Sequence, residues 1–312
     1  MDLKGDSEAG TAMSFAKTAH AFANFWTNNH DFHLIFALGD RYEMAAALLS
    51  AIPFGLRIAH LCGGDVTAGA TDQMYRDMIS MVATYHFTTE EKSAERVRSI
   101  KRTYPNQFVL NVGSLAIEQL MRHQDMHLLD FVNKFGLDYN QDFVLITIHP
   151  ETMNLHHSNE QMSAFHDFLH RLLKDTNDQL LITLPNADAT SDAWRGMLLK
   201  VAEENVERVF CHQSMGVNGY YTAMRNCKVM VGNSSSGIVE AATFGTWVIN
   251  IGDRQLGRTM NENVFNVPFN GDEIWRYYQK VPKEKYFGGN VYGKGDTSKQ
   301  IWTAIESIEY EK

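Results

Sequence analysis

The sequence predicts an α/β fold in which parallel sheets carry helices on their faces. Short runs rich in β-branched and apolar residues alternate with longer segments of helical periodicity, which is the order expected of repeated strand–helix units. Glycine and polar residues follow each apolar run, as at a turn that leads into a helix. At 312 residues the chain is long enough for two domains of ordinary size.

Strands and helices follow one another along the chain with few interruptions. The expected strands are HLIFAL, LRIAHL, TYHFTT, FVLNVG, FVLITI, QLLITL, RVFCH, KVMVG and WVINI. The expected helices lie near residues 8–28, 42–51, 73–83, 90–101, 115–126, 159–174, 191–204, 217–226, 236–245 and 297–310. Residues 127–141 hold a glycine and a polar stop before a strong strand, so we expect the joint between two α/β domains there.

Composition and charge narrow the class of function. Hydrophobic residues make up 44% and charged residues 21%, as in globular proteins. The net charge of −9 argues against nucleic acid or an anionic membrane as the partner, but leaves room for a small anionic ligand. The sequence contains no apolar run of membrane-spanning length and no secretory signal. Cys62, Cys211 and Cys227 lack metal-binding spacing, which suits a reducing cytosol and predicts a cytoplasmic protein.

The turns after the expected strands carry the functional signal. They read ALGDR, AHLCGGD, TIHPE, TLPNAD, VGNSSSG and NIGDR. In open α/β sheets, ligands bind outside the carboxyl ends of the strands. Two such domains that face each other would line a cleft with these turns. The alternative is that polar loops are general in α/β proteins, although six turns this rich in Asp, Arg, His, Asn and Ser exceed that expectation.

A serine-rich turn is the strongest local motif. In VGNSSSGIVEAATFG, a strand ends and a helix begins, so backbone N–H groups and the hydroxyls of Ser234 and Ser235 form a candidate phosphate site. The alternative is a plain serine N-cap. Glu240, one turn into this helix, can accept hydrogen bonds from ribose hydroxyls, or it is a solvated glutamate favoured by the helix dipole.

Three more strand-end residues extend this candidate anion site. Arg254 follows the next strand and can neutralise a diphosphate, or it pairs with Asp253 on the surface. His149, at the end of a buried strand, is a candidate phosphate donor or proton carrier, with a structural histidine as the alternative. Asn186 repeats that position after the following strand.

Carboxylates and arginines cluster after two strands of the first half. Asp40 and Arg41 follow one strand, and HLCGGDVTAGATDQMYRD adds Asp65, Asp72 and Arg76. Carboxylates that converge from adjacent strands can act as acid and base in proton transfer. The alternative is that Asp65 and Asp72 only cap turns and a helix. No metal motif and no glycine-rich dinucleotide fingerprint is present, so we expect no metal and no cofactor.

The motifs GDRYE, HLCGGDVTAGATDQMYRD, IHPET, LPNAD, GNSSSGIVEAATFGTWVINIGDRQLGR and NENV together resemble the hydrolysing UDP-N-acetylglucosamine 2-epimerases of sialic- and legionaminic-acid synthesis. The resemblance covers nearly the whole chain. It implies two Rossmann-like domains that face each other across a cleft, the GT-B-like architecture. The domains would be an N-terminal, sugar-facing domain at 1–135, a UDP-binding domain at 136–295, and a helix at 296–312 that packs back on the first domain.

The resemblance also implies roles for the candidate residues. UDP would be bound by His149, Asn186, Ser234, Ser235, Glu240 and Arg254, and the sugar would face Asp40, Arg41, Asp65, Asp72 and Arg76. The reaction would eliminate UDP to a glycal and add water with the opposite configuration at C2, releasing the free manno-configured sugar. The substrate would be UDP-N-acetylglucosamine or a UDP-diacetamido sugar, and the enzyme a homo-oligomer, dimer or tetramer.

Two departures from the family pattern leave alternatives open. The family motif His-x-Glu-Gly-Gly-Glu has Cys62 in place of its first glutamate and Asp65 in place of its second, and a thiol is a poor substitute for a carboxylate. The family's first strand and Gly-Thr-Arg turn have no counterpart here, so we expect an incomplete first domain with uncovered apolar sheet surface. The alternatives are an impaired relative that binds UDP or its sugar without efficient turnover, and a non-hydrolysing epimerase or glycosyltransferase of the same architecture.

Overall fold

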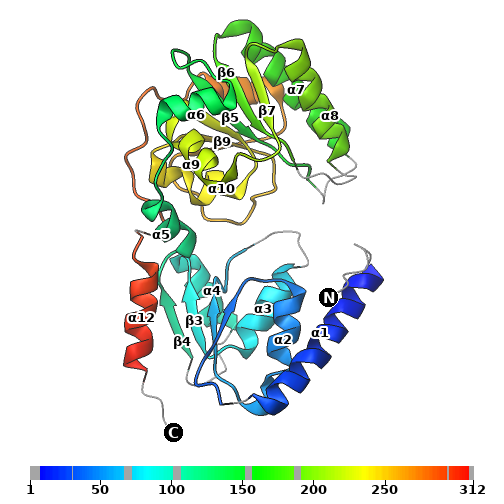
Figure 1. Cartoon of the computed structure of the whole chain (residues 1–312), viewed down its shortest axis with the longest axis vertical. Coiled ribbons are helices and arrows are strands. Elements are labelled where there is room, and N and C mark those ends of the chain that lie inside the picture. The colour runs from blue at the N-terminus through cyan, green and yellow to red at the C-terminus, as the bar shows by residue number, and fades with distance from the viewer. Residues whose placement is uncertain are drawn as a thin grey trace. The chain divides into compact units, whose positions relative to one another are not determined.

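The structure, a computed structural model, describes residues 8–29, 31–66, 72–100, 107–151, 157–185, 191–293 and 295–308 (Figure 1). The chain divides into two compact units: unit 1 comprises Met1–Glu118 and Tyr292–Lys312, and unit 2 comprises Gln119–Val291. The described strands of each unit form a parallel sheet, which confirms the predicted α/β class.

Unit 1 holds a four-stranded sheet in the order β1-β2-β3-β4. Its strands are β1 (Ile35–Leu38), β2 (Ile58–Leu61), β3 (Tyr85–Thr88) and β4 (Phe108–Asn111). Its helices are α1 (Glu8–Asn28), α2 (Tyr42–Leu49), α3 (Asp72–Val82), α4 (Glu91–Ile100) and α12 (Thr297–Ser307). Helix α5 (Leu115–Arg122) begins in unit 1 and ends in unit 2. Neighbouring strands are also consecutive in the chain, so the turns that follow them lie next to one another at one edge of the sheet.

Alternate residues of β2 pack on opposite faces of this sheet. Ile58 is buried with Leu48 of α2 and Ile79 of α3. Ala59 points to the other face, where Ile301 of α12 is part of the same buried cluster. This alternation is the period of two expected of a strand with both faces covered.

Strand β1 lies at the edge of the sheet and leaves apolar side chains in solvent. Its only partner among the described strands is β2, and Phe36 and Leu38 are 47% and 57% exposed. Both residues lie on the same face of the strand. The outer edge of this sheet is therefore apolar where β1 is exposed, and the homo-oligomer stays a prediction.

Unit 2 holds a six-stranded sheet in the order β10-β9-β8-β5-β6-β7. Its strands are β5 (Phe143–Thr147), β6 (Gln179–Thr183), β7 (Val209–His212), β8 (Val229–Gly232), β9 (Val248–Ile251) and β10 (Val264–Val267). Its helices are α6 (Leu128–Phe135), α7 (Ser158–Asp175), α8 (Asp192–Glu204), α9 (Gly216–Asn226), α10 (Ser235–Val239) and α11 (Gly271–Tyr278).

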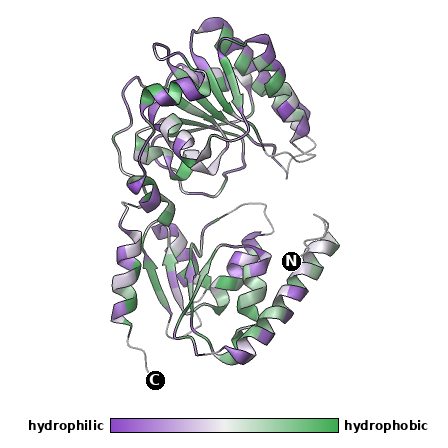
Figure 2. Ribbon diagram, viewed as in Figure 1, coloured by the Kyte–Doolittle hydropathy of each residue, from purple (hydrophilic) through white to green (hydrophobic). Residues whose placement is uncertain are grey.

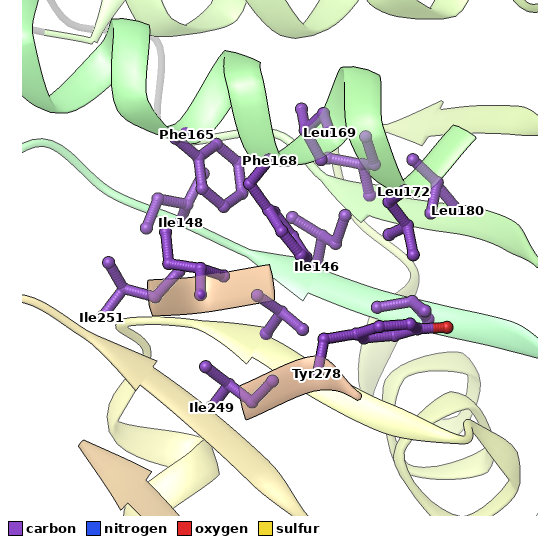
Figure 3. Close-up of a cluster of buried hydrophobic side chains, with 14 of the residues drawn as sticks. Ile146, Ile148, Phe165, Phe168, Leu169, Leu172, Leu180, Ile249, Ile251 and Tyr278 are labelled. Atoms are coloured by element: carbon purple, nitrogen blue, oxygen red, sulfur yellow. The ribbon is translucent and has the colours of Figure 1, made fainter. Parts of the chain in front are cut away.

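Apolar side chains cover both faces of the unit 2 sheet. The hydrophobic residues of both units concentrate in the strands (Figure 2). On one face, Phe165 and Phe168 of α7 lie against Ile146 and Ile148 around β5 (Figure 3). The opposite face packs Leu145 of β5 against residues of α6, α9 and the segment after α10. The core therefore fixes the strand ends that carry the serine-rich turn.

Four features of unit 2 differ from the expectations. Strand β10 and helix α11 were not expected, and the helix expected at 236–245 is α10 followed by a separate 3-10 turn, Ala241–Phe244. The segment 127–141, expected as the joint, contains α6, which packs into the unit 2 core through Phe131 and Phe135, so the boundary between units falls earlier.

The described part of the chain has no helix long and apolar enough to span a membrane.

Candidate active site

The acidic residues expected to face the sugar come together in unit 1 as an acid cluster, which we define as Asp40, Asp65, Asp72 and Arg76. Asp40 follows β1, Asp65 follows β2, and Asp72 opens α3. Arg76 is buried, with its side chain 8% exposed, and it donates to the Asp40 carboxylate and to the main-chain oxygen of Asp65 at 2.7 Å. One guanidinium therefore ties together the turns that follow two adjacent strands.

The carboxylate of Asp65 is held by hydroxyl groups that the sequence did not single out. Its Oδ1 accepts hydrogen bonds from Thr89 Oγ1 at 2.5 Å and from Ser93 Oγ at 2.8 Å. Thr89 follows β3 and Ser93 lies in α4. The expected strand TYHFTT ends on Thr88 and Thr89, and that polar strand end was the signal that could have identified Thr89.

Asp72 and Arg41 lie in different surroundings. Partial burial, and then the charge of nearby Asp40, raise the pKa of Asp72, which favours its protonated form. Arg41 has a side chain that is 67% exposed, and it pairs with Glu43 at 3.1 Å. Arg41 therefore stands at the solvent-exposed rim of the group.

Cys62 occupies a left-handed backbone position beside the acid cluster. Its φ is 64°, a conformation that residues other than Gly, Asn and Asp rarely adopt. Burial, and then the carboxylate of Asp65, raise the pKa of the Cys62 thiol to about 12. The thiol is therefore protonated at neutral pH and is not suited to take a proton from carbon.

His60, two residues before Cys62, is fully buried beneath the cluster. Its Nδ1 lies 3.1 Å from Ser80 Oγ and its Nε2 lies 3.4 Å from the main-chain oxygen of Gly39. A Cβ on Gly63 would lie 2.8 Å from the imidazole, so the glycine lets the turn approach the ring. His60 thus supports the turns after β1 and β2 from below.

The burial of His60 predicts an acid-sensitive stability. Burial, above all, lowers its pKa to about 4, so between pH 6.5 and 4 the unfolded chain binds a proton that the folded chain does not. Stability should therefore fall as the pH falls through this range, by about 3 kcal/mol for this residue. Urea unfolding at several pH values gives the free energy of unfolding as a function of pH. For His60→Gln this free energy should fall less steeply with falling pH than for the wild type, and His170→Gln serves as the comparison at an exposed position. If the free energy of unfolding of His60→Gln depends on pH as steeply as that of the wild type, His60 is not the source of the acid sensitivity.

The serine-rich turn of unit 2, which we call the serine loop (residues 232–237), is fixed by Gly232 and Asn233. Gly232 has a φ of 144°, and a Cβ there would lie 1.9 Å from the main-chain oxygen of Thr147. The buried amide of Asn233 accepts from the main-chain N–H of His149 and donates to its main-chain oxygen, both at 2.8 Å. The turns after β8 and β5 are therefore locked together, and His149 is carried beside the serine loop.

The three serines of the serine loop have different surroundings. Ser234 is the N-cap of α10, with its hydroxyl accepting from the main-chain N–H of Ser236, so the alternative of a capping serine applies to it. Ser236 lies 2.7 Å from the Tyr220 hydroxyl, and Ser235 is exposed. Ser235 and the start of α10 therefore present donors to solvent.

Arg254 is anchored to the same loop. Its Nη1 donates to the main-chain oxygen of Asn233 at 3.0 Å. The buried carboxylate of Glu151 accepts from the main-chain N–H groups of Asp253 at 2.6 Å and Arg254 at 3.0 Å. A Cβ on Gly252 would lie 2.3 Å from this carboxylate, so only glycine fits there. Glu151, which the motif TIHPE already contained, is a structural partner of Arg254 that the sequence interpretation missed.

Glu240 lies at the far end of α10. Burial raises the pKa of its carboxyl, and the Tyr221 hydroxyl donates to it at 3.5 Å. Asn186 lies outside the described residues. The described residues hold no group of three or more His, Cys, Asp or Glu suited to bind a metal ion.

Comparison with known proteins supports the resemblance found in the sequence. Residues 1–306 match the family model described as UDP-N-acetylglucosamine 2-epimerase. A UDP-N,N'-diacetylbacillosamine 2-epimerase (hydrolyzing) from Legionella pneumophila is 30% identical over 278 residues, which are 88% of this chain and 71% of the relative. A GDP/UDP-N,N'-diacetylbacillosamine 2-epimerase (hydrolyzing) from Campylobacter jejuni is 29% identical over 284 residues, 91% of this chain and 72% of the relative.

Solved structures show the same fold. The UDP-GlcNAc 2-epimerase from Neisseria meningitidis, solved with UDP-GlcNAc, aligns with a TM-score of 0.76 at 17% identity, covering 99% of this chain and 84% of that one. The enzyme from Methanocaldococcus jannaschii, solved with UDP-GlcNAc and UDP, has a TM-score of 0.76 at 13% identity, covering 98% of this chain and 83% of that one. These likenesses confirm the GT-B-like α/β fold class. With the family model matched over nearly all of its length, the chain belongs to the UDP-N-acetylglucosamine 2-epimerase family.

Proposed function

We propose that the chain converts a UDP-linked N-acetyl amino sugar to UDP and the free 2-epimer. The observation that carries this proposal is the acid cluster, in which Arg76 ties Asp40 to the turn that holds Asp65. Relatives at about 30% identity are named hydrolysing 2-epimerases of UDP-diacetamido sugars, which supports a substrate of that class or UDP-N-acetylglucosamine. The corresponding role is in sialic- or legionaminic-acid synthesis.

The proposed reaction is an elimination followed by hydration. The C1–O bond to UDP breaks and its electron pair leaves with the diphosphate, while a base removes the C2 proton to leave a C1=C2 glycal. Water then adds its oxygen to C1, and a proton returns to C2 from the opposite face. The sum is UDP-sugar plus water giving UDP plus the manno-configured sugar, so no external oxidant or reductant is required.

The acid cluster supplies groups for both proton transfers. Asp40 is ion-paired with Arg76 and still has a side chain that is 26% exposed, which suits a base that must reach substrate. Asp72, whose pKa is raised, suits the acid. Asp65 is the third carboxylate, and Arg41 and Arg76 are the proposed sugar-binding cations.

The serine loop and its neighbours are the proposed UDP site. Ser234, Ser235 and the N–H groups at the start of α10 would bind phosphate, and Arg254 would balance the charge of the leaving diphosphate. Glu240 is the proposed ribose acceptor. His149 is held beside the loop by Asn233, which supports a role as a phosphate donor. Asn186 completes the proposed set.

A second candidate function is favoured by Cys62. A thiol with a pKa of about 12 replaces the glutamate of the family motif, which favours a relative that binds UDP or its sugar with slow turnover. The non-hydrolysing and glycosyltransferase alternatives differ from both by their products.

Product analysis separates these functions. The protein is incubated in D2O with UDP-N-acetylglucosamine and, separately, with a UDP-diacetamido sugar, and the products are followed by NMR. Release of UDP with a manno-configured sugar that carries deuterium at C2 is the expected result. UDP binding by calorimetry without efficient turnover supports the second candidate function. UDP-N-acetylmannosamine without UDP release, or transfer of sugar to an acceptor, would assign one of the other two.

A further inference from the structure

The first turn of α4, together with the residue that follows β3, forms a cradle around Asp65. Thr89 Oγ1 and Ser93 Oγ both donate to the same carboxylate oxygen, Oδ1, at 2.5 and 2.8 Å. Both residues are buried, at 5% and 3% exposure, so water does not compete for these hydroxyls. Two donors that approach one oxygen from different residues fix the rotation of the side chain as well as its position.

The main chain of the Asp65 turn is seated on the same helix. Arg96 Nη1 donates to the main-chain oxygen of Gly64 at 3.0 Å. Gly64 has a φ of 80°, and a Cβ there would lie 2.2 Å from the main-chain oxygen of Ser93. The turn therefore packs directly on α4, which contacts its backbone at Gly64 and, through Ser93, the carboxylate of Asp65.

A second carboxylate, that of Glu90, also lies near the Ser93 hydroxyl. Its hydroxyl lies 3.2 Å from Oε1 of the buried Glu90, farther than the 2.8 Å to Asp65. A hydroxyl carries one proton and can donate it to one acceptor at a time, so the shorter bond goes to Asp65. Oε2 of Glu90 accepts from the main-chain N–H of Lys92 at 3.0 Å, which holds Glu90 at the start of the helix.

We propose that Thr89 and Ser93 are positioning residues that hold the Asp65 carboxylate in its productive orientation at the sugar. This inference rests on the proposed function, because it assigns Asp65 a part in the reaction. Reaction rates in an active site depend steeply on the placement of the groups around the reacting atoms, and a displacement of about 1 Å can cost about 100-fold in rate. Loss of either hydroxyl should therefore act on kcat and leave binding of the nucleotide nearly unchanged.

The chain offers a matched pair of threonines for the test. Thr88 and Thr89 are adjacent and buried, but the Thr88 hydroxyl donates to the main-chain oxygen of Glu90 at 3.4 Å. Valine has the shape of threonine without its hydroxyl, so Thr89→Val and Thr88→Val remove comparable groups. We expect Thr89→Val to lower kcat about 10- to 100-fold, with KM within about 3-fold. We expect Thr88→Val to change kcat less than about 3-fold and Thr89→Ser to restore most of the rate.

The experiment measures kcat and KM with the UDP-sugar that the wild-type protein turns over, UDP affinity by calorimetry, and folding by circular dichroism. Ser93→Ala is a second variant with the same expected effect on kcat. The proposal is overturned if Thr89→Val and Ser93→Ala keep wild-type kcat, or if Thr88→Val loses as much kcat as Thr89→Val. A wild-type protein that binds UDP but turns over no UDP-sugar overturns the proposed reaction, and the positioning role with it.

Discussion

Asp40→Asn is expected to lower kcat about 100- to 10,000-fold while UDP affinity stays within about 2-fold of wild type, because asparagine cannot take a proton. The carboxylate of Asp40 accepts from Arg76, and asparagine keeps an oxygen for that bond. The proposed UDP site is built from the serine loop and its neighbours in unit 2, so the change leaves those contacts intact. Steady-state kinetics give kcat, and titration calorimetry with UDP gives the affinity.

The control for this variant is an acid outside the cluster. Asp77, one residue after Arg76, accepts from Gln73 within α3 at 3.0 Å, so Asp77→Asn should keep wild-type kcat. Asp40→Asn also weakens a charged hydrogen bond to a buried guanidinium, which should cost about 1.5–3 kcal/mol of unfolding free energy, measurable by urea denaturation. Wild-type turnover by folded Asp40→Asn would show that another group is the base.

Most of the fold was predictable because its strands are short apolar runs with polar stops. All nine expected strands are present. The elements that were missed carried weaker or misinterpreted signals. Helix α11 begins after Asn270, whose side chain accepts from the N–H of Glu273 at 3.0 Å, a capping signature that the sequence contained. Helix α6 ends at Phe135 and is capped by Gly136, which has a φ of 82° and was interpreted as part of a joint.

The candidate site was predictable to the extent that it follows from strand order. Asp40 and Asp65 follow adjacent parallel strands, so the sheet brings them to one edge. The partners of Asp65 could not be predicted in this way. Ser93 lies 28 positions further along, and its contact depends on how closely α4 packs on Gly64, which no local pattern encodes. The left-handed backbone of Cys62, with a φ of 64°, was likewise not predictable from a local pattern.

Cys62→Glu is expected to raise kcat about 10- to 100-fold at neutral pH, because it places a carboxyl group where the motif His-x-Glu-Gly-Gly-Glu has its first glutamate. The native thiol has a pKa of about 12, so it is protonated at pH 7 and is a weak acid compared with a carboxyl group. Burial and the carboxylates of Asp65 and Asp40, which raise the thiol pKa, would also favour the protonated form of a glutamate there. The introduced group should therefore act as an acid, and the gain should decline as the pH rises above its pKa.

The matched control is Cys62→Gln, which has the size of glutamate but cannot ionise. Both variants keep a non-glycine residue at a φ of 64°, so the backbone cost is shared between them. The comparison of kcat between the two isolates the carboxyl group from the added volume. If Cys62→Glu is no faster than Cys62→Gln, then Asp40, Asp65 and Asp72 already carry the proton transfers. These three residues then take the role of the glutamate that Cys62 replaces. If Cys62→Glu alone is faster, the native chain is a slow enzyme whose kcat is limited by the missing carboxyl group.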